Sequence, residues 1–155
     1  MNYDHIEIDF IQRTVMLLEQ YEEIRKKIEP EKQYNHTLLI NCFLGIIVLP
    51  KEKHLSYIPC DRITSKLREE FGIEKSKIGQ HVKNLKDLII QLRHSVAHFN
   101  LNCISLPEGS KTIDAIQFID AKSNEIIIEF VSNELLPFVK KIAEKIIENI
   151  NTHKS

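Results

Sequence analysis

Residues 76–99 read SKIGQHVKNLKDLIIQLRHSVAHF and carry the clearest periodicity in the chain. Apolar side chains recur every three or four residues in this stretch, at Ile78, Val82, Leu85, Ile89, Leu92, Val96 and Phe99. Such spacing places side chains on one face of a helix. The stretch therefore predicts one long helix from about Ser76 to Phe99, with its apolar face in the core.

The sequence on either side predicts further helices and one pair of strands. Helices are expected over about Ile6–Ile28, Gln33–Val48, Asp61–Phe71 and Ser132–Ile150, with Asp61 and Ser132 as N-caps and Gly72 as a stop. The apolar face of the first helix is expected to contain Phe10, Leu17, Tyr21, Ile24 and Ile28. Pro50–Pro59 is expected to form a loop, because proline disfavours helix in the residue before it.

Two runs near the C-terminus alternate and are rich in β-branched residues, as half-buried strands are. They are Ile113–Asp120 and Glu125–Val131, and a turn cluster at Pro107–Ser110 precedes them. The predicted fold class is therefore mainly α: an antiparallel helical bundle with a small β-hairpin inserted before the C-terminal helix. A length of 155 residues favours a single domain, residues 1–155.

Composition limits the possible partners and compartments. The net charge is −1, from 21 basic and 22 acidic side chains, whereas proteins that coat nucleic acid carry a clear positive excess. Any nucleic-acid contact should be local, and residues 75–98 supply a basic segment, which is also typical of a solvated helix face. Cys42, Cys60 and Cys103 are odd in number and far apart, which favours a reducing, cytoplasmic location.

Several site types are not expected. The N-terminus lacks the apolar core of a signal peptide, and the apolar run Leu38–Leu49 is too short to cross a bilayer, so no membrane association is expected. The spacing of His, Cys and acidic residues suggests no metal site. The four glycines form no phosphate-binding loop, so no cofactor is expected. A catalytic role for Ser95 is rejected, because no strand-turn-helix elbow surrounds it.

In residues 92–100, LRHSVAHFN, several polar side chains lie off the core-facing side of the predicted helix. On an ideal helix Arg93 and His98 lie ~140° apart around the axis and ~7.5 Å apart along it. Ile90 and Ala97 fall between them and form a second, smaller apolar strip. Two apolar strips on one helix imply that each strip is buried, one in the core and the other against a partner subunit.

Arg93-x-x-x-x-His98 at the end of a long core helix resembles the signature motif of the HEPN superfamily (higher eukaryotes and prokaryotes nucleotide-binding). The polar His94 after the arginine fits as well, and the segment HTLLINCFLGIIVLPKE, the late hairpin and the terminal helix resemble a plasmid- and prophage-borne branch. The resemblance spans nearly the whole chain, from Ile11 to Ile147.

The resemblance implies a homodimer whose two motifs face one composite cleft that cuts RNA without a metal. The ribose 2′-OH would attack the adjacent phosphate, with His98 in the acid and base roles and Arg93 on the phosphate. His94 and Asn100 would position the phosphate or the leaving oxygen. A toxin or phage-defence role follows, with an antitoxin or nucleotidyltransferase as a possible partner.

Other interpretations remain open at this point. His98 can act as a favourable partner of the helix dipole, and His94 and Asn100 can be surface or capping residues. Asn41, inside an apolar helix, is expected to make a structural hydrogen bond that supports the motif rather than to touch substrate. The chain can also be a non-catalytic dimeric HEPN module that binds RNA, a nucleotide or a partner protein, or a purely structural helical dimer.

Overall fold

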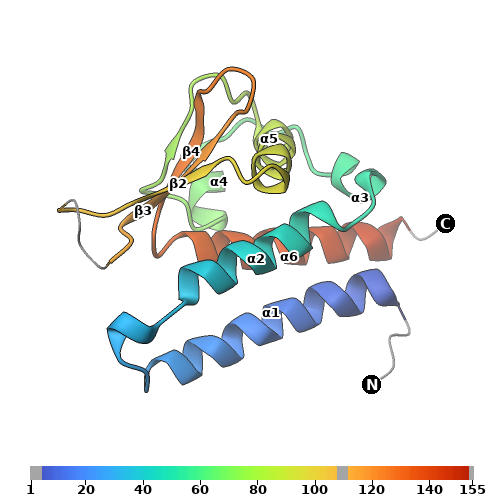
Figure 1. Cartoon of the computed structure of the whole chain (residues 1–155). Helices are drawn as coiled ribbons and strands as arrows, with labels where there is room; N and C mark the ends of the chain where they lie inside the picture. Colours follow the sequence, from blue (N-terminus) through green and yellow to red (C-terminus); the bar gives the residue numbers. More distant parts are fainter. Residues whose placement is uncertain (1–4, 108–111, 154–155) are drawn as a thin grey trace.

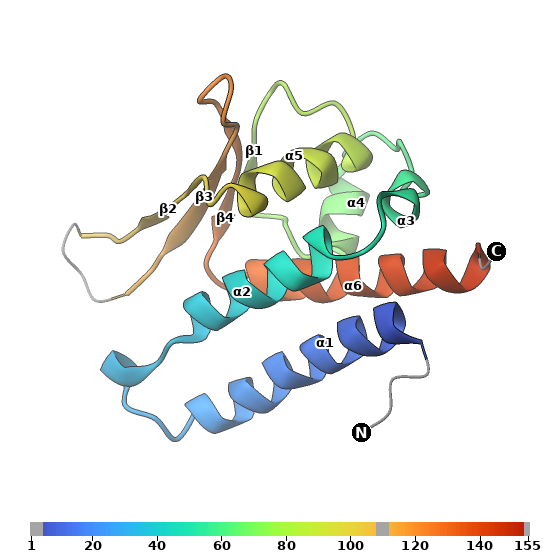
Figure 2. The same cartoon turned by 45° about the vertical axis from the view of Figure 1, so that its right-hand side comes forward.

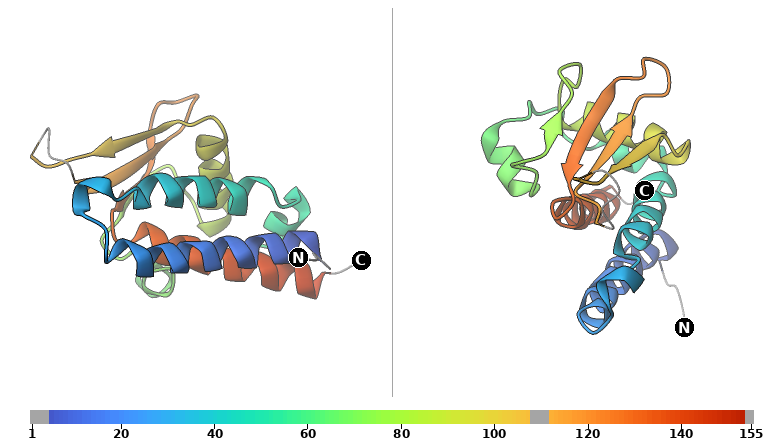
Figure 3. Two further views of the ribbon diagram at one scale, coloured as in Figure 1. Left: turned by 60° about the horizontal axis from the view of Figure 1, so that its bottom comes forward. Right: turned by 60° about the vertical axis from the view of Figure 1, so that its left-hand side comes forward.

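Three long helices lie alongside one another in the computed structural model, which describes residues 5–107 and 112–153. They are α1 (Ile6–Arg25), α2 (Asn35–Val48) and α6 (Leu135–Thr152). α1 runs antiparallel to both α2 and α6, and α2 lies between α1 and α5 (Leu85–Ala97) (Figures 1 and 2). α5 crosses α2 at a steep angle, so the mainly α prediction is confirmed but the bundle is not antiparallel throughout (Figure 3).

The C-terminal helix forms where the apolar spacing predicts it, but it begins at Leu135, and Glu134 rather than Ser132 is its N-cap. Its residues Leu135, Phe138, Val139, Ile142, Ala143, Ile146 and Ile150 are all buried, which is the spacing of one broad helix face. Pro137 is tolerated because it lies in the first turn, where a backbone N–H has no acceptor within the helix.

The apolar face predicted for α1 is wrong. Its buried residues are Ile8, Ile11 and Leu18, whereas Phe10, Leu17 and Ile24 are exposed by 36%, 48% and 56%. α1 carries two apolar faces, and periodicity alone does not say which one α2 and α6 cover. The uncovered face leaves apolar side chains on the surface.

Short elements replace the predicted loop and part of a predicted helix. Pro30–Lys32 forms the 3₁₀ turn η1, and Glu52–Ser56 forms the short helix α3 within the segment expected to be a loop. Helix α4 spans only Ser65–Glu70, and its N-cap is Thr64, whose hydroxyl accepts from the backbone N–H of Leu67. Asp61 is therefore not the cap, although Gly72 does terminate this region, with a φ of 66°.

The helix predicted over Ser76–Phe99 begins nine residues late. Lys77–Ile78 forms strand β1, and the backbone N–H of Gly79 donates to Ile127. A Cβ at Gly79 would lie 2.3 Å from the Ile126 carbonyl oxygen, so the chain needs glycine there. Asn84 then caps α5 by accepting from the N–H of Asp87, and this N-cap signal was present in the sequence.

A four-stranded antiparallel sheet takes the place of a simple hairpin. The hairpin itself is present as β3 (Ala115–Ile119) and β4 (Ile126–Val131), but β2 (Leu101–Ile104) and β1 flank it in the order β1-β4-β3-β2. The predicted turn over Pro107–Ser110 falls largely outside the described residues. The predicted hairpin is therefore the centre of a larger sheet.

Sheet and helices share one core. Phe118 and Phe130 from the sheet meet Phe43 of α2 and Phe138 of α6, with ring centroids 5.0–6.2 Å apart. The buried carboxylate of Glu134 joins the two parts at another point, because it accepts from the backbone N–H groups of Lys75 and Ser76 and from the Ser76 hydroxyl. These contacts hold the sheet against α2 and α6.

Candidate functional site

α5 and α2 together position Arg93. The side chain is half-buried, and its Nη2 donates to the backbone carbonyl of Val48, 3.3 Å away. Val48 is the last residue of α2, where carbonyls have no partner within the helix. The guanidinium therefore joins the two helices and keeps its other N–H donors available for a phosphate.

The end of α5 is a Schellman motif that fixes the backbone after Arg93. His98 is the C-cap, the N–H of Phe99 donates to Val96, and the N–H of Asn100 donates to Ser95. The residue in the left-handed conformation is Phe99, with a φ of 56°, where glycine is usual. The sequence therefore places a bulky residue at a strained position beside the motif histidine.

Ser95 anchors this turn to the sheet. It is buried, its hydroxyl donates to the carbonyl of Asn100 at 2.7 Å, and it accepts from the N–H of Ile119 at 3.2 Å. The same N–H donates to the carbonyl of Asn100 at 2.9 Å. One hydroxyl thus links the last turn of α5, the start of β2 and the end of β3.

The two motif histidines point to solvent. His94 and His98 are exposed, and within residues 5–107 and 112–153 neither imidazole hydrogen-bonds to another residue. His98 also lies at a helix C-terminus, where a protonated imidazole is favourable, so the helix-dipole interpretation stays compatible with its position. Asn100 is half-buried, with its backbone in the Schellman turn.

Asn41 does not contact the motif directly. It is exposed on the outer face of α2, and its amide donates to the carbonyl of Thr37 at 2.9 Å. Asn41 lies seven residues before Val48, which on an ideal helix is ~10 Å along the axis from the carbonyl that Arg93 contacts. Asn41 shares its helix face with Leu44. A supporting role for Asn41 stays a prediction.

Exposed apolar side chains lie on α5 on either side of Arg93 and near Val48, its contact on α2. Ile90 is 41% exposed one turn before it, and Ala97 is exposed one turn after it. On α2, Leu44 and Leu49 flank Val48 and are exposed by 37% and 65%. The strip expected from the sequence is therefore on the surface, and it continues onto α2.

The apolar surface extends further, to the N-terminal part of α1. Ile6, Phe10, Leu49 and Pro50 line a groove of about 220 Å³, and the Phe10 ring lies over Gly45. Glu7 borders this groove, and its carboxylate lies 3.4 Å from Nε2 of the buried His54. Exposed apolar side chains therefore lie on α1, on α5 and at the end of α2, whose Val48 carbonyl Arg93 contacts.

The basic segment expected near the motif is divided among several elements. Lys77 lies on β1 and pairs with Glu129, and Lys86 donates to the carbonyl of Ser56. His81 hydrogen-bonds Gln91 and lies 3.7 Å from a Glu125 oxygen. These residues therefore do not form the continuous basic helix face that the charge pattern allowed.

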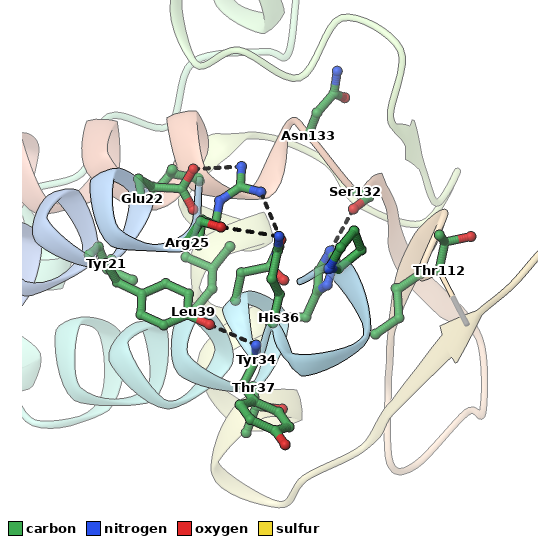
Figure 4. A pocket seen from close by; sticks show the side chains of 16 residues that line it. Tyr21, Glu22, Arg25, Tyr34, His36, Thr37, Leu39, Thr112, Ser132 and Asn133 are labelled. Atoms are coloured by element: carbon green, nitrogen blue, oxygen red, sulfur yellow. Dashed lines mark hydrogen bonds and ion pairs between the residues drawn. The ribbon is translucent and has the colours of Figure 1, made fainter. Parts of the chain in front are cut away.

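A separate polar cavity lies at the other end of α2. It has a volume of about 450 Å³, and the end of α1, the start of α2 and the turn before α6 line it (Figure 4). His36 Nε2 lies 2.6 Å from the Ser132 hydroxyl, and Arg25 pairs with Glu22 at 2.7 Å. Burial lowers the pKa of His36, the charge of Arg25 lowers it further, and Glu22 partly offsets both. Neither Arg93 nor His98 reaches this cavity.

Two further findings concern metal binding and membrane crossing. Among the described residues there is no group of three or more His, Cys, Asp or Glu side chains arranged to hold a metal ion. No helix in this part of the chain is long and apolar enough to cross a membrane.

A family model described as HEPN pEK499 p136 matches residues 1–153. The chain belongs to the HEPN family. Neither the curated proteins nor the solved structures compared with the chain gave a match. The Arg-x4-His motif thus occurs in a HEPN protein in which Arg93 bridges two helices and His98 ends one.

Sequence reasoning missed two residues of the candidate site. Ser95 was considered only as a nucleophile, and its anchoring bonds depend on β3, which lies 20 residues further along the chain. Phe99 was assigned to the core because it continues the apolar spacing, yet the helix ends before it. Asn100 gave only an approximate signal for the helix end, because asparagine is common at the left-handed position there, but Phe99 occupies that position.

We expect Ser95→Ala to lower the free energy of unfolding by roughly 1–2 kcal/mol, because the carbonyl of Asn100 and the N–H of Ile119 lose a buried partner. Urea unfolding of wild type and variant measures the change. Ser65→Ala, at an exposed serine on α4, is the control and should change stability by less than about 0.5 kcal/mol. Equal effects of the two substitutions would contradict the anchoring role.

Acid should destabilise the HEPN fold partly through His36. Its folded-state pKa is lowered, so below the ordinary value of about 6.5 the unfolded chain binds a proton that the folded chain resists. The free energy of unfolding should therefore fall as the pH drops through this range. His36→Gln should reduce the loss between pH 7.5 and 5.5 in urea unfolding experiments, and an unchanged pH dependence would contradict this assignment.

Proposed function

We propose that this HEPN protein is a metal-independent endoribonuclease that acts as a homodimer, with residues 1–155 as one domain. One observation carries the proposal: Arg93 is held at the α2–α5 junction, and the exposed His98 ends the same helix on a backbone fixed by Ser95. A guanidinium and a solvent-accessible imidazole, five residues apart on a rigid frame, suit attack on a phosphodiester.

The cleavage step requires two groups that exchange protons. A neutral His98 imidazole removes the proton of the ribose 2′-OH, and the 2′-oxygen forms a bond to the adjacent phosphorus. The bond from phosphorus to the 5′-oxygen breaks, and the protonated His98 of the second protomer gives that oxygen a proton. The products are a 2′,3′-cyclic phosphate and a 5′-hydroxyl.

Arg93 stabilises the negative charge that builds on the phosphoryl oxygens in this step. Its planar fork can hold two of these oxygens while its bond to Val48 keeps it oriented. His94 and Asn100 flank the same turn and are proposed to position the phosphate or the leaving oxygen. Asn41, on the neighbouring face of α2, is proposed to support the site.

The surface around the motif supports the dimer. A lone protomer exposes Leu44, Leu49, Ile90 and Ala97 beside Arg93, and burial of apolar area drives association. A twofold contact over this face would bring the two Arg93 and His98 pairs toward each other, since an isologous interface uses the same patch on both protomers. We further propose a role in toxin–antitoxin or phage-defence conflict, with an antitoxin or nucleotidyltransferase as partner.

The activity is tested with purified protein, structured RNA and EDTA. We expect cleavage that leaves 2′,3′-cyclic phosphate ends, abolished by His98→Ala and reduced roughly 10²–10³-fold by Arg93→Lys, because lysine keeps the charge but loses the fork. His5→Gln, at an exposed histidine outside the motif, is the matched control and should leave the rate unchanged.

The alternative is a non-catalytic HEPN module that binds RNA, a nucleotide or a protein, and the net charge of −1 is compatible with it. Binding of RNA without cleavage by wild type would replace the ribonuclease proposal with this one. Absence of both binding and cleavage would leave a structural helical dimer.

Ala97→Glu should break the dimer, because it would place paired like charges in the proposed interface. Sedimentation velocity of the variant should give a monomer, with helix content unchanged by circular dichroism. Ala121→Glu, at an exposed alanine in the β3–β4 turn, is the control and should stay dimeric. A dimer that survives Ala97→Glu would place the interface elsewhere.

A further inference from the structure

Phe99 is an unusual surface residue. Its side chain is 73% exposed, the highest value among the large hydrophobic side chains that the structure describes. Single exposed apolar residues are common and need no explanation by themselves. Phe99 differs from them because its backbone is also strained, with a φ of 56°.

The strain has a recognisable cost and no compensating contact. The left-handed conformation is unfavourable for an L-residue with a Cβ, and glycine avoids this cost at the end of a helix. A buried ring could repay the cost through packing, but this ring lies in solvent. A residue held under strain by its surroundings is a candidate for function.

The surroundings hold Phe99 firmly. Its own N–H donates to Val96, and the next residue is fixed through both its N–H and its carbonyl by Ser95. The ring therefore extends from a rigid turn between His98 and Asn100. A preorganised aromatic ring loses little freedom when a ligand packs on it.

Position and chemistry together indicate the ligand. Aromatic side chains bind RNA by stacking on bases that are not paired, and the bases inside a duplex are not available for this. We propose that Phe99 stacks on an unpaired nucleobase beside the phosphate held by Arg93 and His98, so that the substrate is single-stranded RNA. This inference rests on the proposed ribonuclease function and adds its substrate class.

The charge distribution agrees with a contribution of base stacking to RNA affinity. The chain has a net charge of −1, and Lys77 and Lys86 of the basic segment are engaged by Glu129 and the carbonyl of Ser56. Contacts to the backbone phosphates alone would therefore give weak binding. A base stacked on Phe99 supplies affinity that needs no net positive charge.

The chain contains no tryptophan, which allows a direct test. F99W in the His98→Ala background introduces a single indole and prevents cleavage. A 12-nucleotide single-stranded RNA should quench its fluorescence, and a blunt duplex of the same length should quench it at least about tenfold less at equal concentration. I24W in the same background, at an exposed site on α1, is the matched control and should not respond.

The outcomes separate the two proposals. If fluorescence polarisation of labelled RNA shows binding while the indole of F99W does not respond, stacking is wrong and the proposed function stands. Equal quenching by the duplex overturns the single-strand assignment. If wild type neither cuts nor binds RNA, the proposed function fails, and this inference fails with it.

Phe99→Gly distinguishes a substrate contact from a structural role. It removes both the ring and the strain, so the melting temperature should stay the same or rise, while KM for single-stranded RNA should increase roughly 10- to 100-fold. Phe99→Tyr keeps the ring and should stay close to wild type. A fall in melting temperature, or a loss of the dimer in Phe99→Gly, would assign the ring to folding or to the interface and overturn the proposal.

Discussion

The hydroxyl of Ser95 is the interaction on which the candidate site depends. It reaches the carbonyl of Asn100 and the N–H of Ile119 in a buried position, where a polar group without a partner is costly. Asn100 directly precedes β2, and Ile119 is the last residue of β3. The serine therefore fixes where α5 ends relative to the sheet. His98 and Phe99 lie inside the turn that this bond closes, so their positions follow from it.

The second constraint is the contact of Arg93 with the end of α2. α2 packs against α1, α5 and α6, and its buried residues include Phe43, which meets the aromatic rings of the sheet and α6. Through the carbonyl of Val48, the motif arginine is therefore tied to a helix whose buried residues pack in the core. The His98 imidazole is exposed, so the site combines an arginine held by α2 with a histidine that solvent can reach.

The exposed apolar side chains have a common origin. α1 and α5 each carry two apolar faces, and the core covers one face of each. The faces left over include Phe10 on α1 and Ile90 on α5, and Leu49 at the end of α2 lines a groove with Phe10. A surface of this kind, with Arg93 at its edge, is what a second protomer would cover in the proposed enzyme.

The sequence by itself determined the elements that are clear apolar runs between turn or capping residues. α2, α6 and the C-terminal part of α5 were predictable, as were β3 and β4, because such residues bound each run. Arg93 and His98 were proposed from the sequence, since their spacing and their place at a helix end are local properties; their catalytic role stays a prediction.

Only the tertiary structure decided the rest. Ile78 and Val82 fit a helical period, yet Gly79 pairs with Ile127 across the sheet and no helix forms there. The covered face of α1 depends on how α2 and α6 pack, and the exposure of Phe99 depends on Ser95 reaching β3. In each case the deciding partner is distant in sequence, and a local pattern contains no information about which distant group will satisfy a hydrogen bond or cover an apolar face.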